Sequence, residues 1–358
     1  MGRLDSLDWL RGLLAFSIMI YHLTSWEISP LESSHLLGRL GIYGVSMFFV
    51  LSGLSMAVAY SKYHCNIACA LNFFIRRIYR IWPLLWLAII FVTIGKLALN
   101  KEVDFVELLL NFTTLFGFVS PGSYINTGAW SIGNEMVYYA LTPFLLYIFD
   151  KRVLYGNILL VASIFLGGVF ALELISSINT LANQWNTYIN PFNNLFFYIA
   201  GIAIYFNIYK WKFGNEMVLA VLFAGLAIFL FYPSEGGEIQ LITGGNRITF
   251  SIASILLVIG FYKLNVRIPA LMTTPLTQLG IITYGVYLLH PIIYQSIKIL
   301  SNKLNLPNSS ITTISLTIVI TIVLSLMAYQ FVEKPLIEVG KKVANNLFKL
   351  TIKMQGKN

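Results

Sequence analysis

Long apolar stretches alternate with short polar connections along the whole chain. Windows of about 20 mainly apolar residues have the length that crosses a bilayer as a helix. Such windows predict ten membrane-spanning helices, at residues 9–26, 41–60, 81–99, 130–149, 153–175, 192–209, 216–232, 248–263, 277–297 and 311–332. A further apolar run, 108–119, is too short to cross, and we interpret it as a re-entrant or interfacial segment held against protein.

Composition supports lipid as the solvent of these segments. Of the 358 residues, 57% are hydrophobic and 11% are charged, whereas about 25% are charged in an average soluble domain. One water-soluble core cannot bury so much apolar surface. The sequence therefore predicts an all-α integral membrane protein in contact with the lipid bilayer.

The basic residues indicate the orientation, because Lys and Arg concentrate on the cytoplasmic side of membrane proteins. With the N-terminus in the cytoplasm, 18 of the 24 basic residues fall on the inner side and 6 on the outer side. This split predicts that both termini are cytoplasmic and that the number of crossings is even. We expect a multi-pass protein of the cell (inner) membrane. The net charge of +9 then reflects topology, and nucleic acid is not an expected partner.

The sequence contains no linker or repeat that would separate soluble modules. We expect one membrane domain, 1–333, and a short basic cytoplasmic tail, 334–358. Cys65 and Cys69 lie near His64, but their number and spacing do not suit a zinc site, so we expect reduced thiols and no metal.

Two ionisable residues interrupt the first apolar segment. Arg11 and His22 are close to three helical turns apart, so they share one face and lie about 16 Å apart along the axis. Ionisable groups inside membrane segments are functional by default. The alternative is that Arg11 extends to the headgroups and that His22 is an interfacial polar residue.

Glu135 follows Trp130 at the start of another predicted helix, where its depth is expected to match that of His22. A carboxylate bonded to an imidazole fixes the tautomer and makes the other ring nitrogen a better base. We therefore predict a His22–Glu135 pair. The alternative is that amides at the helix N-terminus satisfy the Glu135 carboxylate.

Three arginines, Arg76, Arg77 and Arg80, mark the predicted cytoplasmic mouth of the third helix. Spacings of three and four residues place Arg80 on a common face with each of the other two. Guanidinium groups bind phosphates bidentately. Anchoring by the positive-inside rule explains the cluster equally well on charge alone.

Short motifs along nearly the full length resemble acyltransferase family 3, the polytopic membrane acyltransferases that modify bacterial surface polysaccharides. The matching motifs are RGLLAFSIMIYH, GVSMFFVLSGL, RRIYR, WSIGNE, YGVYLLHP and FVEKP. Asn134 stands where many members carry a second acidic residue, which speaks against a two-carboxylate mechanism. Many members also carry a C-terminal esterase-like domain, and we expect none within these 358 residues.

The resemblance implies that an acyl group, most often acetyl, moves from cytoplasmic acyl-CoA to a hydroxyl of a cell-surface or lipid-linked glycan on the outer side. Acyl-CoA (acetyl-CoA) is then a donor substrate, and no permanently bound cofactor is expected. In this scheme His22 deprotonates the acceptor hydroxyl and Glu135 orients the imidazole. The residues expected to bind the phosphates of coenzyme A are Arg11, Arg76, Arg77 and Arg80.

Further candidates follow from the same scheme. Ser131, Asn134 or Tyr287 would donate to the oxyanion, and nothing in the sequence chooses among them. His290 either lines the acceptor site or caps carbonyl groups freed by the proline that follows it. Glu333 is expected to mark a helix end, with a structural role.

A transporter or flippase is the alternative function, with Arg11, His22 and Glu135 as a relay. Transporters usually show two halves of similar hydropathy, and the sequence shows no such repeat.

Overall fold

The computed structural model of the chain describes residues 4–61, 67–265, 269–305 and 309–355. Two residues considered above, His64 and Cys65, lie outside these ranges, as do the basic residues Arg3, Lys62, Arg267 and Lys357. Within the described ranges every regular element is a helix and no strand occurs. The predicted all-α class is confirmed.

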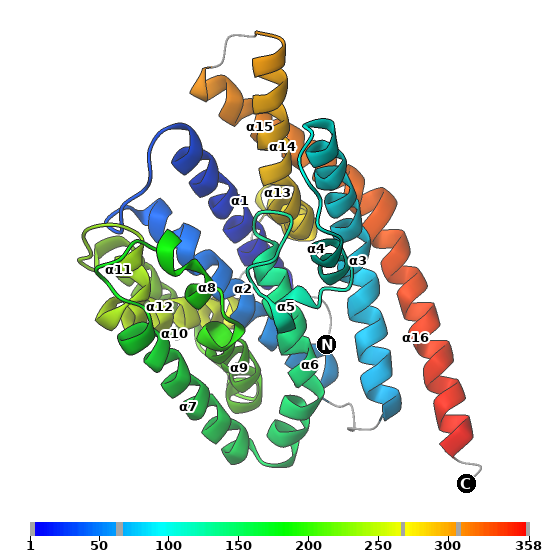
Figure 1. Ribbon diagram of the computed structural model, residues 1–358. Coiled ribbons are helices and arrows are strands. Elements are labelled where there is room, and N and C mark those ends of the chain that lie inside the picture. Colours follow the sequence, from blue (N-terminus) through cyan, green and yellow to red (C-terminus); the bar gives the residue numbers. More distant parts are fainter. Residues whose placement is uncertain (1–3, 62–66, 266–268, 306–308, 356–358) are drawn as a thin grey trace.

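All ten apolar windows are helical along most of their length (Figure 1). The long helices are α1 (Asp5–Glu27), α2 (Leu36–Tyr60), α3 (Ile67–Ala98), α6 (Ala129–Lys151), α7 (Val153–Val169), α9 (Pro191–Ile208), α10 (Asn215–Phe231), α12 (Gly244–Lys263), α13 (Ala270–Ile281), α14 (Thr283–Lys303), α15 (Ser310–Ala328) and α16 (Lys334–Gln355). The short elements are α4 (Phe105–Phe112), α5 (Phe116–Val119), α8 (Trp185–Tyr188), α11 (Ile239–Ile242), the π-helices η1 (Phe170–Leu174) and η3 (Tyr329–Glu333), and the 3₁₀-helix η2 (Ala182–Gln184).

Fewer helices qualify as membrane spans than the windows predict. In the described part of the chain, five helices are long and apolar enough to cross a bilayer, or six if α13 and α14 form one bent span. The predicted count of ten is therefore not confirmed, and the cytoplasmic location of both termini stays a prediction. The outward face of α7 is nonetheless strongly apolar, since Leu154, Ile158, Val161 and Phe165 are all more than half exposed. Such a surface suits lipid, and the chain is a multi-pass membrane protein.

Two predicted segments are broken in the structure. The window 277–297 bends by 68° between α13 and α14. At this bend the Thr283 hydroxyl donates to the carbonyl oxygens of Leu279 and Gly280, which competes with the backbone ladder. The run 108–119 folds as α4 and α5, and its Phe116 side chain is fully buried. This segment is held against protein, and its re-entrant character stays a prediction.

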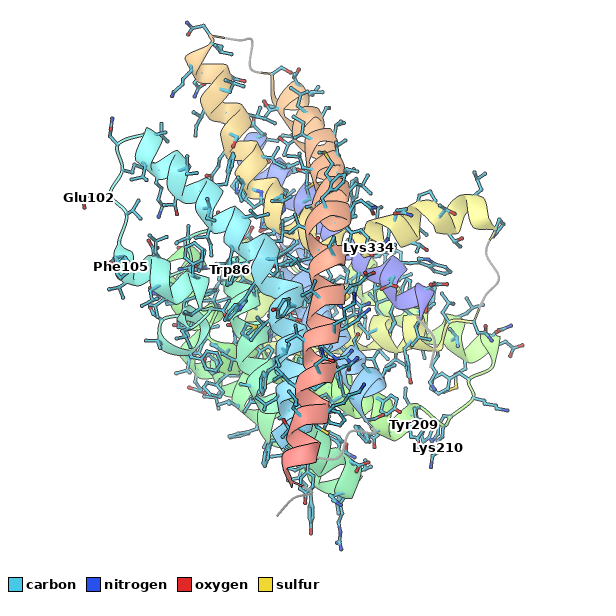
Figure 2. All side chains as sticks on the ribbon, turned by 90° about the vertical axis from the view of Figure 1, so that its right-hand side faces the viewer. Trp86, Glu102, Phe105, Tyr209, Lys210 and Lys334 are labelled. Carbon is cyan, nitrogen blue, oxygen red and sulfur yellow. The ribbon has the colours of Figure 1, made fainter. Side chains whose placement is uncertain are left out.

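The C-terminal helices form one continuous rod. α15, η3 and α16 run together over Ser310–Thr351, so the predicted start of the tail at 334 lies inside a helix. Figure 2 shows α16 crossing the view from the middle, at Lys334, to the lower edge. α16 packs along α3, where Gly340 contacts the Tyr79 side chain.

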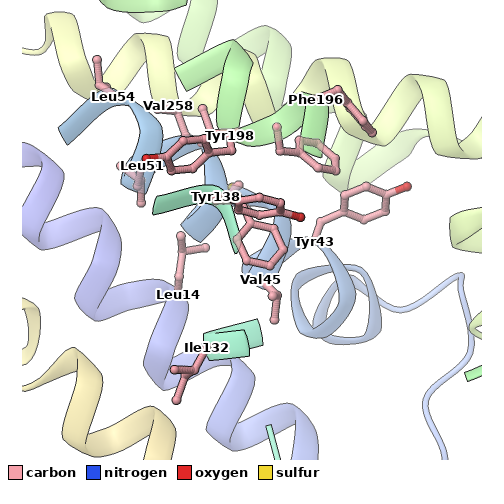
Figure 3. Packing of buried hydrophobic residues seen from close by; sticks show 14 of the residues in the cluster. Leu14, Tyr43, Val45, Leu51, Leu54, Ile132, Tyr138, Phe196, Tyr198 and Val258 are labelled. Carbon is pink, nitrogen blue, oxygen red and sulfur yellow. The ribbon is translucent and has the colours of Figure 1, made fainter. Parts of the chain in front are cut away.

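The central helices α2 and α9 pack so closely that their backbones touch. A Cβ atom on Gly53 would lie 2.0 Å from the Tyr198 carbonyl oxygen, and one on Gly201 would lie 2.0 Å from the Val50 carbonyl oxygen. Small residues permit such contact, which is a common means of helix association in membranes. Figure 3 shows the buried cluster around this contact, in which Leu51, Leu54 and Tyr198 are labelled. This core fixes α2, which forms one wall of the cavity described below.

We expect Gly201→Ala to lower the thermal unfolding midpoint of the detergent-solubilised protein, because the added methyl group forces α2 and α9 apart. Overpacking of this kind costs about 1–3 kcal/mol. The matched control is Gly168→Ala on α7, where nothing lies within 4 Å of an added Cβ atom. The control should leave the midpoint unchanged or raise it slightly, because Ala favours helix over Gly. Equal midpoints for the two variants would contradict the close contact.

Candidate active site

A cavity of about 640 Å³ lies between α1, α2, α3, α6, α14 and η3. Its lining on α2 extends from Ala59 to Val45, a distance of about 21 Å at the rise of an α-helix. One end carries charged side chains and the other carries hydroxyl and aromatic groups. The charged side chains that line it are Asp8, Arg11, Arg77, Arg80, Glu135 and Glu333.

Arg11 is fixed at the charged end by neighbours within the bundle. Its Nη1 donates to Asp8 Oδ1 at 2.7 Å, and its Nη2 donates to the Ser55 hydroxyl. Ser55 in turn donates to the Leu51 carbonyl oxygen at 2.5 Å. Arg11 therefore faces the cavity and does not simply extend to the headgroups.

The three predicted phosphate-binding arginines of α3 do not act as one group. Arg77 and Arg80 line the cavity, whereas Arg76 donates to Asn72 and to Asn345 on α16, each at 2.8 Å. The expectation that all three share one mouth is wrong for Arg76. Arg76 and Arg80 are four residues apart and share one face of α3. The Arg76 guanidinium nevertheless lies in the interface between α3 and α16.

Arg77 and Arg80 both retain free hydrogen-bonding capacity. The Arg77 guanidinium lies 5.8 Å from the ring centroid of Tyr60 and 5.9 Å from that of Tyr139, which suits cation–π attraction. In the described residues, Arg77 Nε has no hydrogen-bond partner and the Arg80 side chain forms no hydrogen bond or ion pair. The exposed Arg80 guanidinium is available to an anionic ligand, whereas Arg77 Nε is enclosed by protein and Arg77 Nη2 donates to the Tyr60 hydroxyl at 3.3 Å.

Glu135 lines the cavity but does not contact His22. Its Oε1 accepts hydrogen bonds from Ser52 at 2.5 Å and from Tyr139. The predicted His22–Glu135 hydrogen bond is therefore wrong within the described structure. Helix periodicity predicted the depth of each residue, but the direction in which Glu135 faces depends on how α6 is rotated against α2, which the sequence does not show.

His22 pairs instead with His290 of α14. His22 Nδ1 lies 2.9 Å from His290 Nε2, and His290 Nδ1 lies 2.9 Å from the Val286 carbonyl oxygen. A carbonyl oxygen only accepts, so His290 Nδ1 must carry a proton and, in neutral rings, His290 Nε2 must accept from His22 Nδ1. The remaining nitrogen, His22 Nε2, then holds a lone pair. This is the arrangement that the predicted carboxylate was expected to provide.

Aromatic rings stand between the cavity and the histidine pair. Phe48 and Tyr287 line the cavity with ring centroids 6.1 Å apart, and the Tyr287 ring lies 6.3 Å from that of His290. The Tyr287 hydroxyl is 2.8 Å from the Ser131 hydroxyl, and both contact the Gly128 carbonyl oxygen. The far end of the cavity thus adjoins the two histidines through Tyr287.

The structure separates the three predicted oxyanion donors. Ser131 and Tyr287 line the cavity, whereas Asn134 is buried behind it and donates to the Ile189 carbonyl oxygen at 3.0 Å. The geometry therefore favours the two hydroxyl groups over the Asn134 amide.

Glu333 is a cavity residue that the sequence interpretation missed. It is only 4% exposed, it lines the charged end, and its Oε1 has no hydrogen-bond partner in the described ranges. It ends the π-helix η3, and such insertions are frequent at functional sites. An acidic residue directly after a long apolar stretch was the available signal, but a helix end explains that pattern equally well.

The loop side of α1 is anchored next to His22. The Tyr21 hydroxyl donates to the carboxylate of Glu238, in the connection that precedes α11. Burial raises the pKa of Glu238 above its usual value, while the Tyr21 hydrogen bond counteracts the shift. This contact fixes the last turns of α1 against the α10–α12 connection.

Comparison with known proteins gives curated relatives with acetyltransferase names. The chain is 24% identical to the peptidoglycan O-acetyltransferase OatA of Listeria monocytogenes, with 92% of this chain and 55% of that protein covered. It is 24% identical to the O-acetyltransferase OatA of Staphylococcus aureus, with 95% and 58% covered. A putative acetyltransferase of Acidianus two-tailed virus is 26% identical, with 78% and 80% covered.

The chain thus spans little more than half the length of the OatA proteins it resembles. No solved structure matches it significantly. The family model described as an acyltransferase domain matches residues 4–330, nearly the whole chain. The predicted resemblance is confirmed, and the chain belongs to acyltransferase family 3.

Proposed function

We propose that this protein is a membrane O-acetyltransferase that transfers acetyl from acetyl-CoA to a glycan hydroxyl, with the N-terminus of the chain in the cytoplasm. The observation that carries the proposal is the cavity that leads from Arg77 and Arg80 to the hydroxyl groups beside the His22–His290 pair. Family membership and the names of the OatA relatives support the reaction class.

The donor fits the charged end of the cavity. The phosphates of acetyl-CoA would bind the guanidinium groups of Arg80 and Arg77, because guanidinium groups bind phosphate oxygens through charge-assisted hydrogen bonds. The pantetheine arm would then extend along α2 toward Tyr287. His22 does not line the cavity, so side chains between them, such as Tyr287, would have to move for the thioester to reach His22.

The reaction needs a base, and His22 Nε2 is the nitrogen with a free lone pair. It would remove the proton from the acceptor hydroxyl as the oxygen attacks the thioester carbonyl carbon. The new C–O bond forms, the C–S bond breaks, and the proton passes from His22 to the thiolate of coenzyme A. Ser131 and Tyr287 would donate to the transient oxyanion.

Transfer can be measured directly with labelled acetyl-CoA. Purified protein is mixed with the total envelope glycan of cells that lack this chain, and ester-linked label in the glycan is counted. We expect wild-type protein to label the glycan and His22→Ala to lose about 100-fold or more of the rate. His35→Ala is the matched control, because His35 is an exposed histidine in the connection before α2. Undiminished transfer by His22→Ala would reject the proposed base, and no transfer by wild-type protein would favour the transport alternative.

We expect His290→Ala to lower kcat by about 10- to 100-fold, because loss of a partner that orients a functional imidazole has effects of this size. The KM for acetyl-CoA should not change, since His290 does not line the cavity. Glu135→Gln should have a smaller effect on kcat, because Glu135 contacts Ser52 and Tyr139 and not His22. A larger loss of kcat in Glu135→Gln than in His290→Ala would contradict the histidine pair.

Replacement of the arginines distinguishes cavity residues from the α3–α16 interface. We expect Arg80→Ala to raise the KM for acetyl-CoA by about 10- to 100-fold, the equivalent of one lost hydrogen bond to a charged group. Arg76→Ala serves as the matched control on the same helix and should change this KM by much less, because Arg76 faces α16. Initial rates at varied acetyl-CoA give both constants. Equal increases in the two variants would mean that the cavity does not hold the phosphates.

A further inference from the structure

Beyond the histidine pair, α1 and α14 continue side by side, and side chains meet at the next turn. Trp26 lies one turn after His22 on α1, and Tyr294 lies one turn after His290 on α14. The Trp26 and Tyr294 ring centroids are 4.9 Å apart. The contact between the two helices therefore extends past the proposed base toward the connection that follows α1.

Charged groups lie at the same end of the two helices. Glu27 Oε1 accepts from the Tyr294 hydroxyl at 2.8 Å and lies 2.9 Å from Lys298 Nζ. The Glu27 side chain is 5% exposed, whereas the Lys298 side chain is 34% exposed. Lys298 thus keeps ammonium N–H groups for a further partner, because an ammonium has three donors and this pair uses only part of them.

Trp26 is unusual because it is both exposed and stacked on the proposed base. Its ring lies 5.0 Å from that of His22 with an interplanar angle of 5°, and 37% of the residue is exposed. Tryptophan is common at membrane interfaces, so its presence at the end of α1 needs no special explanation. Its parallel contact with His22 is not required by that preference, and it places an aromatic surface next to the reacting nitrogen.

We propose that Trp26 is the platform on which a pyranose ring of the acceptor glycan stacks, with Lys298 as a donor to the ring hydroxyls. This inference rests on the proposed function, because it concerns the acceptor of that reaction. One face of a pyranose presents C–H groups, which pack against the electron-rich face of an aromatic ring. Its edge carries hydroxyl groups that need a few well-placed polar partners, which is the usual composition of a small-molecule site.

The position of the platform suits the chemistry. Trp26 is one helical turn, about 5.4 Å, from His22 along α1. A sugar ring on the exposed part of the indole would therefore lie within about one helical turn of His22. Acceptor and donor then approach the histidine pair from opposite ends, so neither has to leave before the other binds.

Acceptor kinetics test this assignment. We expect Trp26→Ala to raise the apparent KM for the total envelope glycan by about tenfold, the equivalent of one lost stacking contact. The KM for acetyl-CoA should stay unchanged, because Trp26 does not line the donor cavity. Trp26→Tyr, which keeps an aromatic face, should restore most of the acceptor affinity. Trp86→Ala is the matched control, since Trp86 is 38% exposed on α3, where Figure 2 labels it.

A second measurement uses unaltered protein and does not depend on how the variants fold. Oxidation of tryptophan by N-bromosuccinimide is followed by peptide mass spectrometry with and without the envelope glycan. We expect the glycan to protect Trp26 and to leave Trp211, which is 61% exposed in the connection after α9, reactive, whereas acetyl-CoA, which has no free thiol, protects neither.

Two results would overturn the assignment. One is an unchanged acceptor KM in Trp26→Ala, including the case in which only kcat falls, since the indole would then merely hold His22 in place. The other is equal oxidation of Trp26 with and without glycan. Both results leave acetyl transfer by wild-type protein intact, so they are distinguishable from a failure of the proposed function, in which wild-type protein transfers no acetyl at all.

Discussion

Ionisable side chains inside apolar helices must find their partners within the protein, because lipid offers no hydrogen bonds. This constraint determines how the helices around the cavity are arranged. Arg11 is satisfied by Asp8 of its own helix and by Ser55 of α2, and Glu135 of α6 is satisfied by Ser52 of α2. The Arg11–Ser55 and Glu135–Ser52 pairs tie α2 to α1 and α6, and α2 also contacts α9 directly through the backbone. The polar groups thus define the walls of the cavity as well as its chemistry.

The same constraint draws attention to polar groups at the cavity that have no hydrogen-bond partner in the described residues. Within the described residues, Arg80 forms no hydrogen bond or ion pair, and Arg77 Nε and Glu333 Oε1 are buried without a partner. All three side chains line one end of the cavity. Buried polar groups are rarely left unsatisfied in native structures. Arg77 Nε and Glu333 Oε1 are therefore candidates for a polar partner at the cavity, and the exposed Arg80 guanidinium adds positive charge beside them.

Apolar length and helical period predicted the secondary structure well, because both are local properties of the chain. All ten windows are helical, and Arg11 and His22 lie on α1 as their spacing required. Predictions that depended on contacts between helices were less successful. The bend at Ile282 arises from the Thr283 hydroxyl and from the packing of Gly280 against α1, and neither effect has a period that a hydropathy window detects.

At the candidate site, too, local properties and contacts between helices differ in how well the sequence predicts them. The first is how deep a residue lies in the membrane, and the second is the direction in which its side chain points. Depth in the membrane is predicted from position in a window and stays a prediction, whereas the structure does bring Ser131 and Tyr287 together in the cavity lining. Direction follows from rotation of each helix about its axis, which the sequence does not reveal. For this reason the sequence pairs Glu135 with the wrong partner, groups Arg76 with residues that it does not join, and predicts a helix end at Glu333.

The histidine pair has a physical advantage over the carboxylate that was expected to orient His22. A buried imidazolium–carboxylate pair must overcome the cost of removing two charges from water, and that cost often exceeds the attraction gained. Two neutral imidazoles avoid this cost, while the Val286 carbonyl oxygen still sets the tautomer of His290 and through it that of His22. Charge then develops on His22 only when an acceptor hydroxyl gives up its proton. Under the proposed mechanism, burial of the neutral base costs little desolvation free energy before the reaction, and the base becomes charged only during acyl transfer.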